Sequence, residues 1–208
     1  IIPLFIFSEK VVEYFRCHLT TGKHRDRVAR KELVGHGRLP ERHLVPAQFN
    51  GRNARLAHAL MLSGQAAGQD AWIESSLNAL TWLCREQTAE GGYFRPVSVK
   101  GWKKGEERRE YFDQQPIEAY TTVAACLNAF RATGDTGWYD RSRQAFDWFL
   151  GRNDLGMEVY DTVSGGCRDG LHVDRVNMNQ GAESTLSFLL SLFEMQLAKN
   201  EVHTFVRP

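Results

Sequence analysis

The stretch Gly68-Gln-Asp-Ala-Trp-Ile-Glu-Ser-Ser-Leu-Asn-Ala-Leu-Thr-Trp82 decides the fold, because its layout returns 66 positions later as Gly134-Asp-Thr-Gly-Trp-Tyr-Asp-Arg-Ser-Arg-Gln-Ala-Phe-Asp-Trp148. Each copy has a Gly-containing turn and then a segment with a Trp near its start and another at its end. A third copy begins at Glu183, where residues 183–196 align with residues 118–131 at the nearby offset of 65. Recurrence at a fixed spacing is typical of repeat architectures. The sequence therefore predicts a repeated structural unit.

Apolar spacing indicates that the repeated unit is a pair of helices. Ile73, Leu77, Leu80 and Cys84 recur at spacings of three and four, which places them on one helical face. Pro116 suits a helix start, and glycines at 134 and 151 suit helix ends. No alternating strand pattern is longer than a few residues. We expect an all-α chain with helices at about 8–19, 53–65, 71–87, 116–133, 137–151 and 182–199.

The connections between the expected helices alternate in length. Residues 67–70 and 134–136 form short turns, whereas residues 88–115 and 152–181 form long loops. This alternation puts both long loops at the same end of the assembly. Loops of this length are usually functional or disordered, and their aromatic, glycine and charged residues favour function. Segments 123–130 and 186–192 are apolar nearly all round, as expected of inner helices covered on both sides.

Composition limits the classes of function. The 208 residues carry a net charge of +1, which argues against a nucleic-acid partner. No apolar run is long enough to span a membrane, so no membrane partner is expected. Cys17, Cys84, Cys126 and Cys167 form no CxxC pair, which favours reduced thiols and a cytoplasmic location. We divide the chain into an N-terminal helix and irregular basic arm (1–52), helix-pair repeats (53–200) and a tail (201–208).

Three motifs carry a resemblance to a known family. They are Phe112-Asp-Gln-Gln-Pro-Ile-Glu-Ala119, Trp148-Phe-Leu-Gly-Arg-Asn-Asp-Leu-Gly156, and Ser164-Gly-Gly-Cys-Arg-Asp-Gly-Leu-His172 continuing to Asn179-Gln-Gly-Ala-Glu-Ser-Thr185. The chain resembles bacterial α/α-toroid proteins met beside, or labelled as, glycosyltransferases, which are similar to the six-hairpin glycosidase superfamily. The resemblance implies an all-α fold, a partial or complete (α/α) toroid, and a carbohydrate ligand. About half of a twelve-helix toroid is visible, so we expect a homo-oligomer or a missing half-toroid.

The two long loops supply the candidate catalytic residues. Glycoside hydrolysis needs two carboxyl groups across one bond. Asp113 in the first loop, with Asp169 or Asp174 in the second, can supply that pair. Asp113 precedes a helix, so a capping or loop-pinning carboxylate is the alternative interpretation. The candidate substrate-binding residues are Trp102, Gln114, Gln115, Glu118, Arg168, His172, Asn179, Gln180 and Glu183.

Neighbouring aromatic residues add candidate sugar-stacking surfaces, at Tyr93, Phe94, Tyr111 and Tyr160 as well as Trp102. Glu118 and Glu183 occupy equivalent repeat positions, so we expect both to point toward the same opening, at the end of the assembly where the long loops lie. The same loop residues also fit a purely structural network of Asp–Arg pairs that holds the toroid together.

Other chemistries lack a pattern. Cys167 and His172 have no second pair at metal-ligand spacing, so we expect no metal. There is no GxSxG elbow, Walker loop or dinucleotide fingerprint, and no cofactor is expected.

The leading hypothesis is a carbohydrate-active module, hydrolase-like if it is an enzyme. The alternatives are a noncatalytic glycan-binding or scaffolding module associated with a glycosyltransferase, and a helical-repeat interaction protein that binds peptide. Carboxylates facing each other across a cleft favour an enzyme, whereas carboxylates tied to arginines favour a scaffold.

Overall fold

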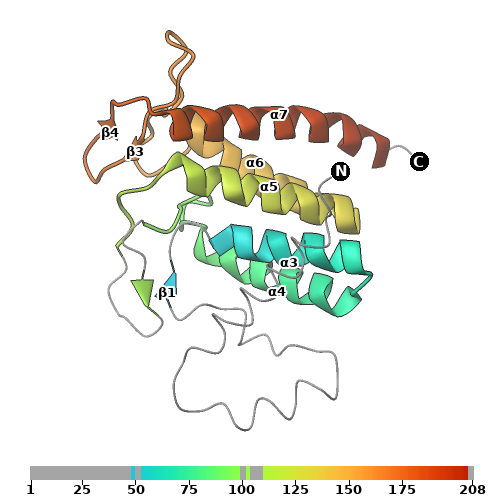
Figure 1. Cartoon of the computed structure of the whole chain (residues 1–208). Coiled ribbons are helices and arrows are strands. Elements are labelled where there is room, and N and C mark those ends of the chain that lie inside the picture. The colour runs from blue at the N-terminus through green and yellow to red at the C-terminus, as the bar shows by residue number, and fades with distance from the viewer. Residues whose placement is uncertain (1–47, 50–52, 99–101, 104–109, 206–208) are drawn as a thin grey trace. The chain divides into compact units, whose positions relative to one another are not determined.

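The computed structural model describes residues 48–49, 53–98, 102–103 and 110–205. These residues are mostly helical, as the sequence predicted (Figure 1). The α-helices are α3 (Asn53–Ala67), α4 (Asp70–Glu86), α5 (Pro116–Thr133), α6 (Thr136–Asp147) and α7 (Ala182–Phe205), and α6 leads into the 3-10 turn η2 (Trp148–Leu150). Among the described residues, none of the helices has both the length and the apolar content needed to cross a membrane.

The strands in this part of the chain are two residues long. β1 (Gln48–Phe49) pairs antiparallel with β2 (Trp102–Lys103), and β3 (Gly170–Leu171) pairs antiparallel with β4 (Val176–Asn177). Each long loop therefore contains one short strand or hairpin rather than a sheet.

Local chemistry sets the helix boundaries. Pro116 occupies the first turn of α5, and the helix ends at Gly134, whose φ is 72° and whose N–H donates to the Phe130 carbonyl. The Asp135 side chain then caps α6 by accepting from the Gly137 N–H at 2.9 Å. The expected helix at 137–151 is shorter as an α-helix, because it tightens into η2 before Gly151, where φ is 93°.

Two other boundaries differ from expectation. The last helix continues through Phe205, past the expected end at residue 199 and across the expected boundary of the tail. The expected helix at 8–19 lies outside the described residues, as does the basic arm up to residue 47.

The chain divides into two compact units. One contains Ala59–Ala79, and the other contains Ala47–His58 and Leu80–Pro208. In the first unit, α3 turns into α4 at Gly68, whose φ is 63°. The Gln69 N–H donates to the Gly64 carbonyl at 2.8 Å, and a Cβ on Gly64 would meet the Ile73 side chain at 2.9 Å. A small residue is therefore required where the two helices approach closely.

The second unit contains the packed trio α5, α6 and α7. Helices α5 and α7 run in the same direction, with both N-termini at the end where the long loops lie (Figure 1). At the far end, the Arg131 guanidinium bonds Glu194 at 3.1 Å and Glu201 at 2.9 Å, which ties the last turns of α5 to the second half of α7. This parallel arrangement is the one expected of successive inner helices.

The core of this unit is aromatic. The Phe188 ring stacks on Tyr160 at a centroid distance of 4.2 Å and meets Phe149 edge-on at 5.4 Å. Trp148 packs against Phe149 at 5.3 Å and has no exposed surface. Because Tyr160 belongs to the second long loop and Phe188 to α7, this cluster holds the loop against the helices.

The two parallel helices differ in how they are covered. Residues 123–127 of α5 are all buried, as expected of an inner helix. On α7, however, Leu186, Leu190, Phe193 and Leu197 are between 43% and 59% exposed. Among the described residues of a single chain, one face of α7 is therefore uncovered.

We expect Phe188→Ala to lower the free energy of unfolding by about 3–5 kcal/mol, because a ring packed in the aromatic core leaves a cavity when it is removed. Val163→Ala is the control, since that side chain is 95% exposed and lies outside the apolar surface of α7. Urea denaturation of both variants checks the prediction. Equal losses of stability would contradict this description of the core.

Candidate functional site

The two long loops meet just before α5. Gln114 and Leu171 exchange backbone hydrogen bonds, each 3.0 Å long, which form an isolated antiparallel bridge. The bridge needs a glycine at position 170, where φ is 134° and a Cβ would collide with the Gln114 carbonyl. This contact places the residues on either side of Gln114 beside those on either side of Leu171.

Asp113 and His172 form a pair next to this bridge. The Asp113 Oδ1 and the His172 Nδ1 are 2.9 Å apart. The Asp113 side chain is 38% exposed and that of His172 is 36% exposed. Asp113 has a φ of 62°, a left-handed conformation that Asp and Asn tolerate better than other non-glycine residues. One candidate from each loop thus contributes to a single polar pair that solvent can reach.

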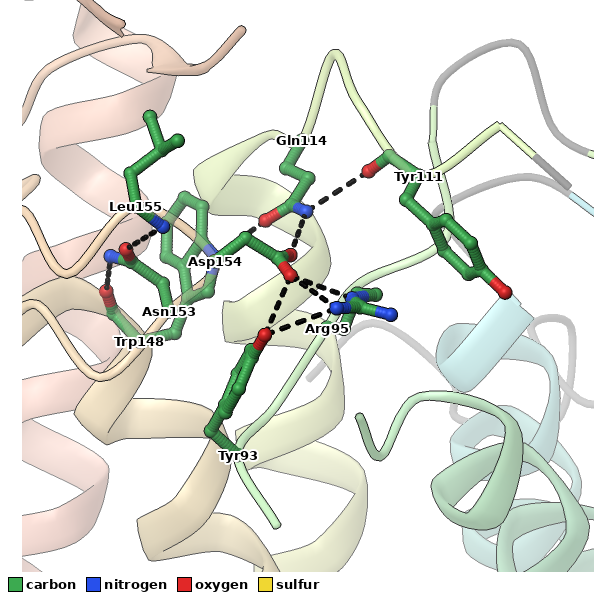
Figure 2. Close-up of polar contacts among 8 residues, drawn as sticks. All are labelled: Tyr93, Arg95, Tyr111, Gln114, Trp148, Asn153, Asp154 and Leu155. Carbon is green, nitrogen blue, oxygen red and sulfur yellow. Dashed lines mark hydrogen bonds and ion pairs between the residues drawn. The ribbon is translucent and has the colours of Figure 1, made fainter. Parts of the chain in front are cut away.

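The Gln114 side chain, next to Asp113, is buried and bonded at both ends of its amide (Figure 2). Its Oε1 accepts from the indole Nε1 of Trp148 at 2.9 Å. Its Nε2 donates to the Asp154 carboxylate at 2.6 Å and to the Tyr111 carbonyl at 2.9 Å. The direction of the indole bond fixes which amide atom is oxygen, so Gln114 has one orientation in this setting.

Asp154 is the charged centre of the same network. Its Oδ1 accepts from the Tyr93 hydroxyl at 2.8 Å and from the Arg95 Nε at 2.7 Å (Figure 2). The carboxylate is 6% exposed, so its charge is balanced inside the network rather than by water. Burial and the hydrogen bond to Asp154 raise the pKa of Tyr93, which keeps its hydroxyl protonated as a donor. The Arg95 guanidinium also covers the Tyr111 ring, 4.6 Å from its centroid.

Asn153 shapes the turn that presents Asp154. Its side-chain amide donates to the carbonyls of Trp148 and Met157 at 2.9 and 2.8 Å, and its Oδ1 accepts from the Leu155 N–H at 3.1 Å. The 148–156 motif is therefore a self-bonded turn that aims one carboxylate at the first loop.

Asp169 has a structural position at the start of α7. Its Oδ1 accepts from the Gly181 N–H at 2.7 Å and from the Ser184 hydroxyl at 2.6 Å, and its own N–H donates to the Asn179 carbonyl at 2.8 Å. Carboxylates stabilise helix N-termini by accepting hydrogen bonds from backbone N–H groups there and by their negative charge. The structure thus places Asp169 at a helix end, separate from the Asp113–His172 pair.

Arg168 and Gln180 hold a hairpin formed by residues 160–167. Arg168 donates to the Glu158 carbonyl at 2.9 Å and lies 3.6 Å from the Asp161 carboxylate. Gln180 donates to Asp161 at 2.8 Å and accepts from Ser164 at 2.7 Å. The Val163 N–H is the main cause that lowers the pKa of Asp161, with Gln180 adding to it. These two candidates therefore act on loop structure.

The remaining candidates are dispersed. Asp174 pairs with its neighbour Arg175 at 2.8 Å on an exposed hairpin. Gln115 is the N-cap residue of α5, and its side chain makes no capping hydrogen bond. Glu118 is 1% exposed in the first turn of α5, whereas Glu183 is exposed in the first turn of α7, so their environments differ despite their equivalent repeat positions.

The last two candidates are described only through their backbones. The Asn179 carbonyl accepts a hydrogen bond from the Asp169 N–H, and the Asn179 N–H donates to the Asn177 Oδ1 at 3.2 Å. Trp102 contributes backbone to β2, and its side chain lies outside the described part of the chain. In the described ranges, no group of three or more His, Cys, Asp or Glu residues is arranged to hold a metal ion.

Sequence reasoning missed the Asp154 network. The sequence predicts no role for Asp154 or Trp148 within their motif, and for Tyr93 it predicts sugar stacking rather than a hydrogen bond to Asp154. The available signal was the joint presence of an acid, an indole and an Arg in or beside the two long loops, but sequence spacing gives no sign of which side chains meet.

We expect Asp169→Ala to lower the free energy of unfolding by about 0.5–2 kcal/mol, because the N-terminus of α7 loses its carboxylate acceptor. Asp174→Ala is the matched control, since that exposed carboxylate pairs with its neighbour Arg175 on a hairpin rather than with a helix end. Thermal melts of both variants check this. An Asp169→Ala melt identical to that of Asp174→Ala would contradict a capping role.

Models of known protein families give no match to this chain, and neither do curated proteins.

Proposed function

We propose that the chain is a carbohydrate-active module whose ligand bonds to the Asp113–His172 pair. The observation that carries the proposal is that this pair joins both long loops while each side chain stays more than one-third exposed. A carboxylate accepts hydrogen bonds from vicinal sugar hydroxyls, and an imidazole both donates and accepts. The motifs that resemble toroid proteins found with glycosyltransferases include both residues, which supports carbohydrate as the ligand class.

The pair also has the elements of proton transfer. When His172 carries its proton on Nδ1, it donates to Asp113, and its unprotonated Nε2 can then accept a ligand hydroxyl proton. A hydrolase-like reaction needs a second carboxyl group. Asp169 is unsuited to be this second carboxyl group because it caps α7. Asp174 is therefore the partner that remains for Asp113.

A noncatalytic glycan-binding or scaffolding module is the second candidate function. The pairing of other loop carboxylates with arginines favours it, since Asp154 is bonded to Arg95 and Asp161 lies near Arg168. In this version, the toroid-like helices display the Asp113–His172 pair to a glycan without cleaving it, beside a partner glycosyltransferase.

We expect Asp113→Asn to weaken glycan binding by at least about tenfold, since a neutral amide accepts hydroxyl hydrogen bonds less strongly than a carboxylate. Asn tolerates the left-handed backbone at this position, so the fold should be retained. A glycan array, followed by affinity measurement on the glycans that bind, gives the comparison with the unsubstituted chain. Unchanged affinity in Asp113→Asn, or no glycan bound by the unsubstituted chain, would overturn the proposal.

Asp174→Asn separates the two versions of the function. As a binding module, the chain should retain its affinity in this variant. As a hydrolase, it should bind the glycan and lose turnover, which product analysis of the same glycans measures. The variant is also the matched control for Asp113→Asn, because it makes the same chemical change on the neighbouring hairpin.

The expected homo-oligomer also remains a proposal. The apolar side chains exposed along α7 are the surface that self-association, or a missing half-toroid, would cover. We expect light scattering to show a mass above that of one chain, and Leu190→Ser with Phe193→Ser to reduce it. A monomer at high concentration would contradict self-association.

A further inference from the structure

Two buried thiols lie side by side away from the candidate site. The Sγ atoms of Cys84 in α4 and Cys126 in α5 are 3.7 Å apart and form a hydrogen-bonding contact. Both residues belong to the larger compact unit. A disulfide bond is about 2.05 Å long, so its formation requires the two sulfurs to approach by less than the width of one atom. The chain therefore holds a preassembled dithiol.

The two thiols are not equivalent. Cys84 is 9% exposed, whereas Cys126 has no exposed surface. The hydrogen bond with Cys126 lowers the pKa of the Cys84 thiol, although burial acts against it. The same hydrogen bond, together with burial, raises the pKa of Cys126. Cys84 is thus the nucleophile of the pair, because it is nearer to solvent and more readily becomes a thiolate.

We propose that Cys84 and Cys126 form a redox-active pair that a hydroperoxide oxidises to an intramolecular disulfide. The Cys84 thiolate attacks one peroxide oxygen, the O–O bond breaks, and Cys84 becomes a sulfenic acid while the second oxygen leaves as water after protonation. Cys126 then loses its proton and attacks the Cys84 sulfur, which forms the S–S bond and releases the sulfenic oxygen as a second water. Two thiols and one hydrogen peroxide give one disulfide and two water molecules.

The bond would enclose the candidate site's first loop. Cys84 lies two residues before the end of α4 at Glu86, just ahead of the first loop, and Cys126 lies in α5, the helix that follows this loop. The disulfide would therefore close a covalent ring containing Tyr93, Arg95, Asp113 and Gln114. Oxidation would restrain the ends of the loop that carries Asp113 without changing any residue of the Asp113–His172 pair.

The experiment is treatment of the folded chain with hydrogen peroxide, followed by alkylation under denaturing conditions and peptide mass spectrometry. The expected product links tryptic peptides 56–85 and 110–131, with a mass about 2 Da below the sum of the two reduced peptides. Reduction with a dithiol should restore both free cysteines. Cys84→Ser and Cys126→Ser should each abolish the linked product.

Two residues serve as internal controls. Cys167 is buried, and burial raises its pKa to about 12, so it should remain free and alkylatable at peroxide doses that link the pair. Met178 is 67% exposed, so its oxidation to the sulfoxide reports that peroxide reached the protein. The proposal is overturned when Met178 is oxidised while Cys84 and Cys126 both stay alkylatable. It is equally overturned when Cys84 proceeds to the sulfinic acid without linkage to Cys126.

Discussion

The hydrogen bonding of one buried amide, that of Gln114, underlies the candidate site. Its oxygen accepts from Trp148 in the aromatic core, and its nitrogen donates to Asp154 in the second loop and to Tyr111 in the first. Its backbone exchanges two hydrogen bonds with Leu171. A buried amide left without partners costs about 1–3 kcal/mol per group, so all four neighbours must keep their places together. The backbone at Asp113, one residue earlier, is fixed by this requirement.

Three carboxylates near the loops are structural, whereas that of Asp113 is accessible to solvent. Asp154 is surrounded by donors, Asp169 holds the start of α7, and Asp161 lies within the hairpin that Arg168 and Gln180 support. These contacts rigidify the two loops around the Asp113–His172 pair. A functional pair on loops is positioned well only when its neighbours are immobile, and buried hydrogen-bonded carboxylates provide that immobility.

Helical content and turn positions could be predicted from the sequence because they depend on local chemistry. Pro116 and Gly134 bound α5 as expected, since a missing N–H and a left-handed φ act within one turn of chain. The end of α7 could not be located from the sequence, because residues 199–205 contain neither a glycine nor a proline that would mark where the helix stops. The burial of Glu118 and the exposure of Leu186 were also missed, since periodicity reports which residues share a face but not what covers it.

The site was only partly predictable for a related reason. Asp113 and His172 were both candidates, yet their pairing depends on the bridge between Gln114 and Leu171, which lie far apart in sequence. The bridge in turn depends on Gly170, because any side chain there would collide with the Gln114 carbonyl. The structure uses Gly170 to admit the backbone of the first loop. A glycine in a loop rich in charged residues thus identifies a close approach, and only the fold decides whether a ligand or the chain itself occupies the space.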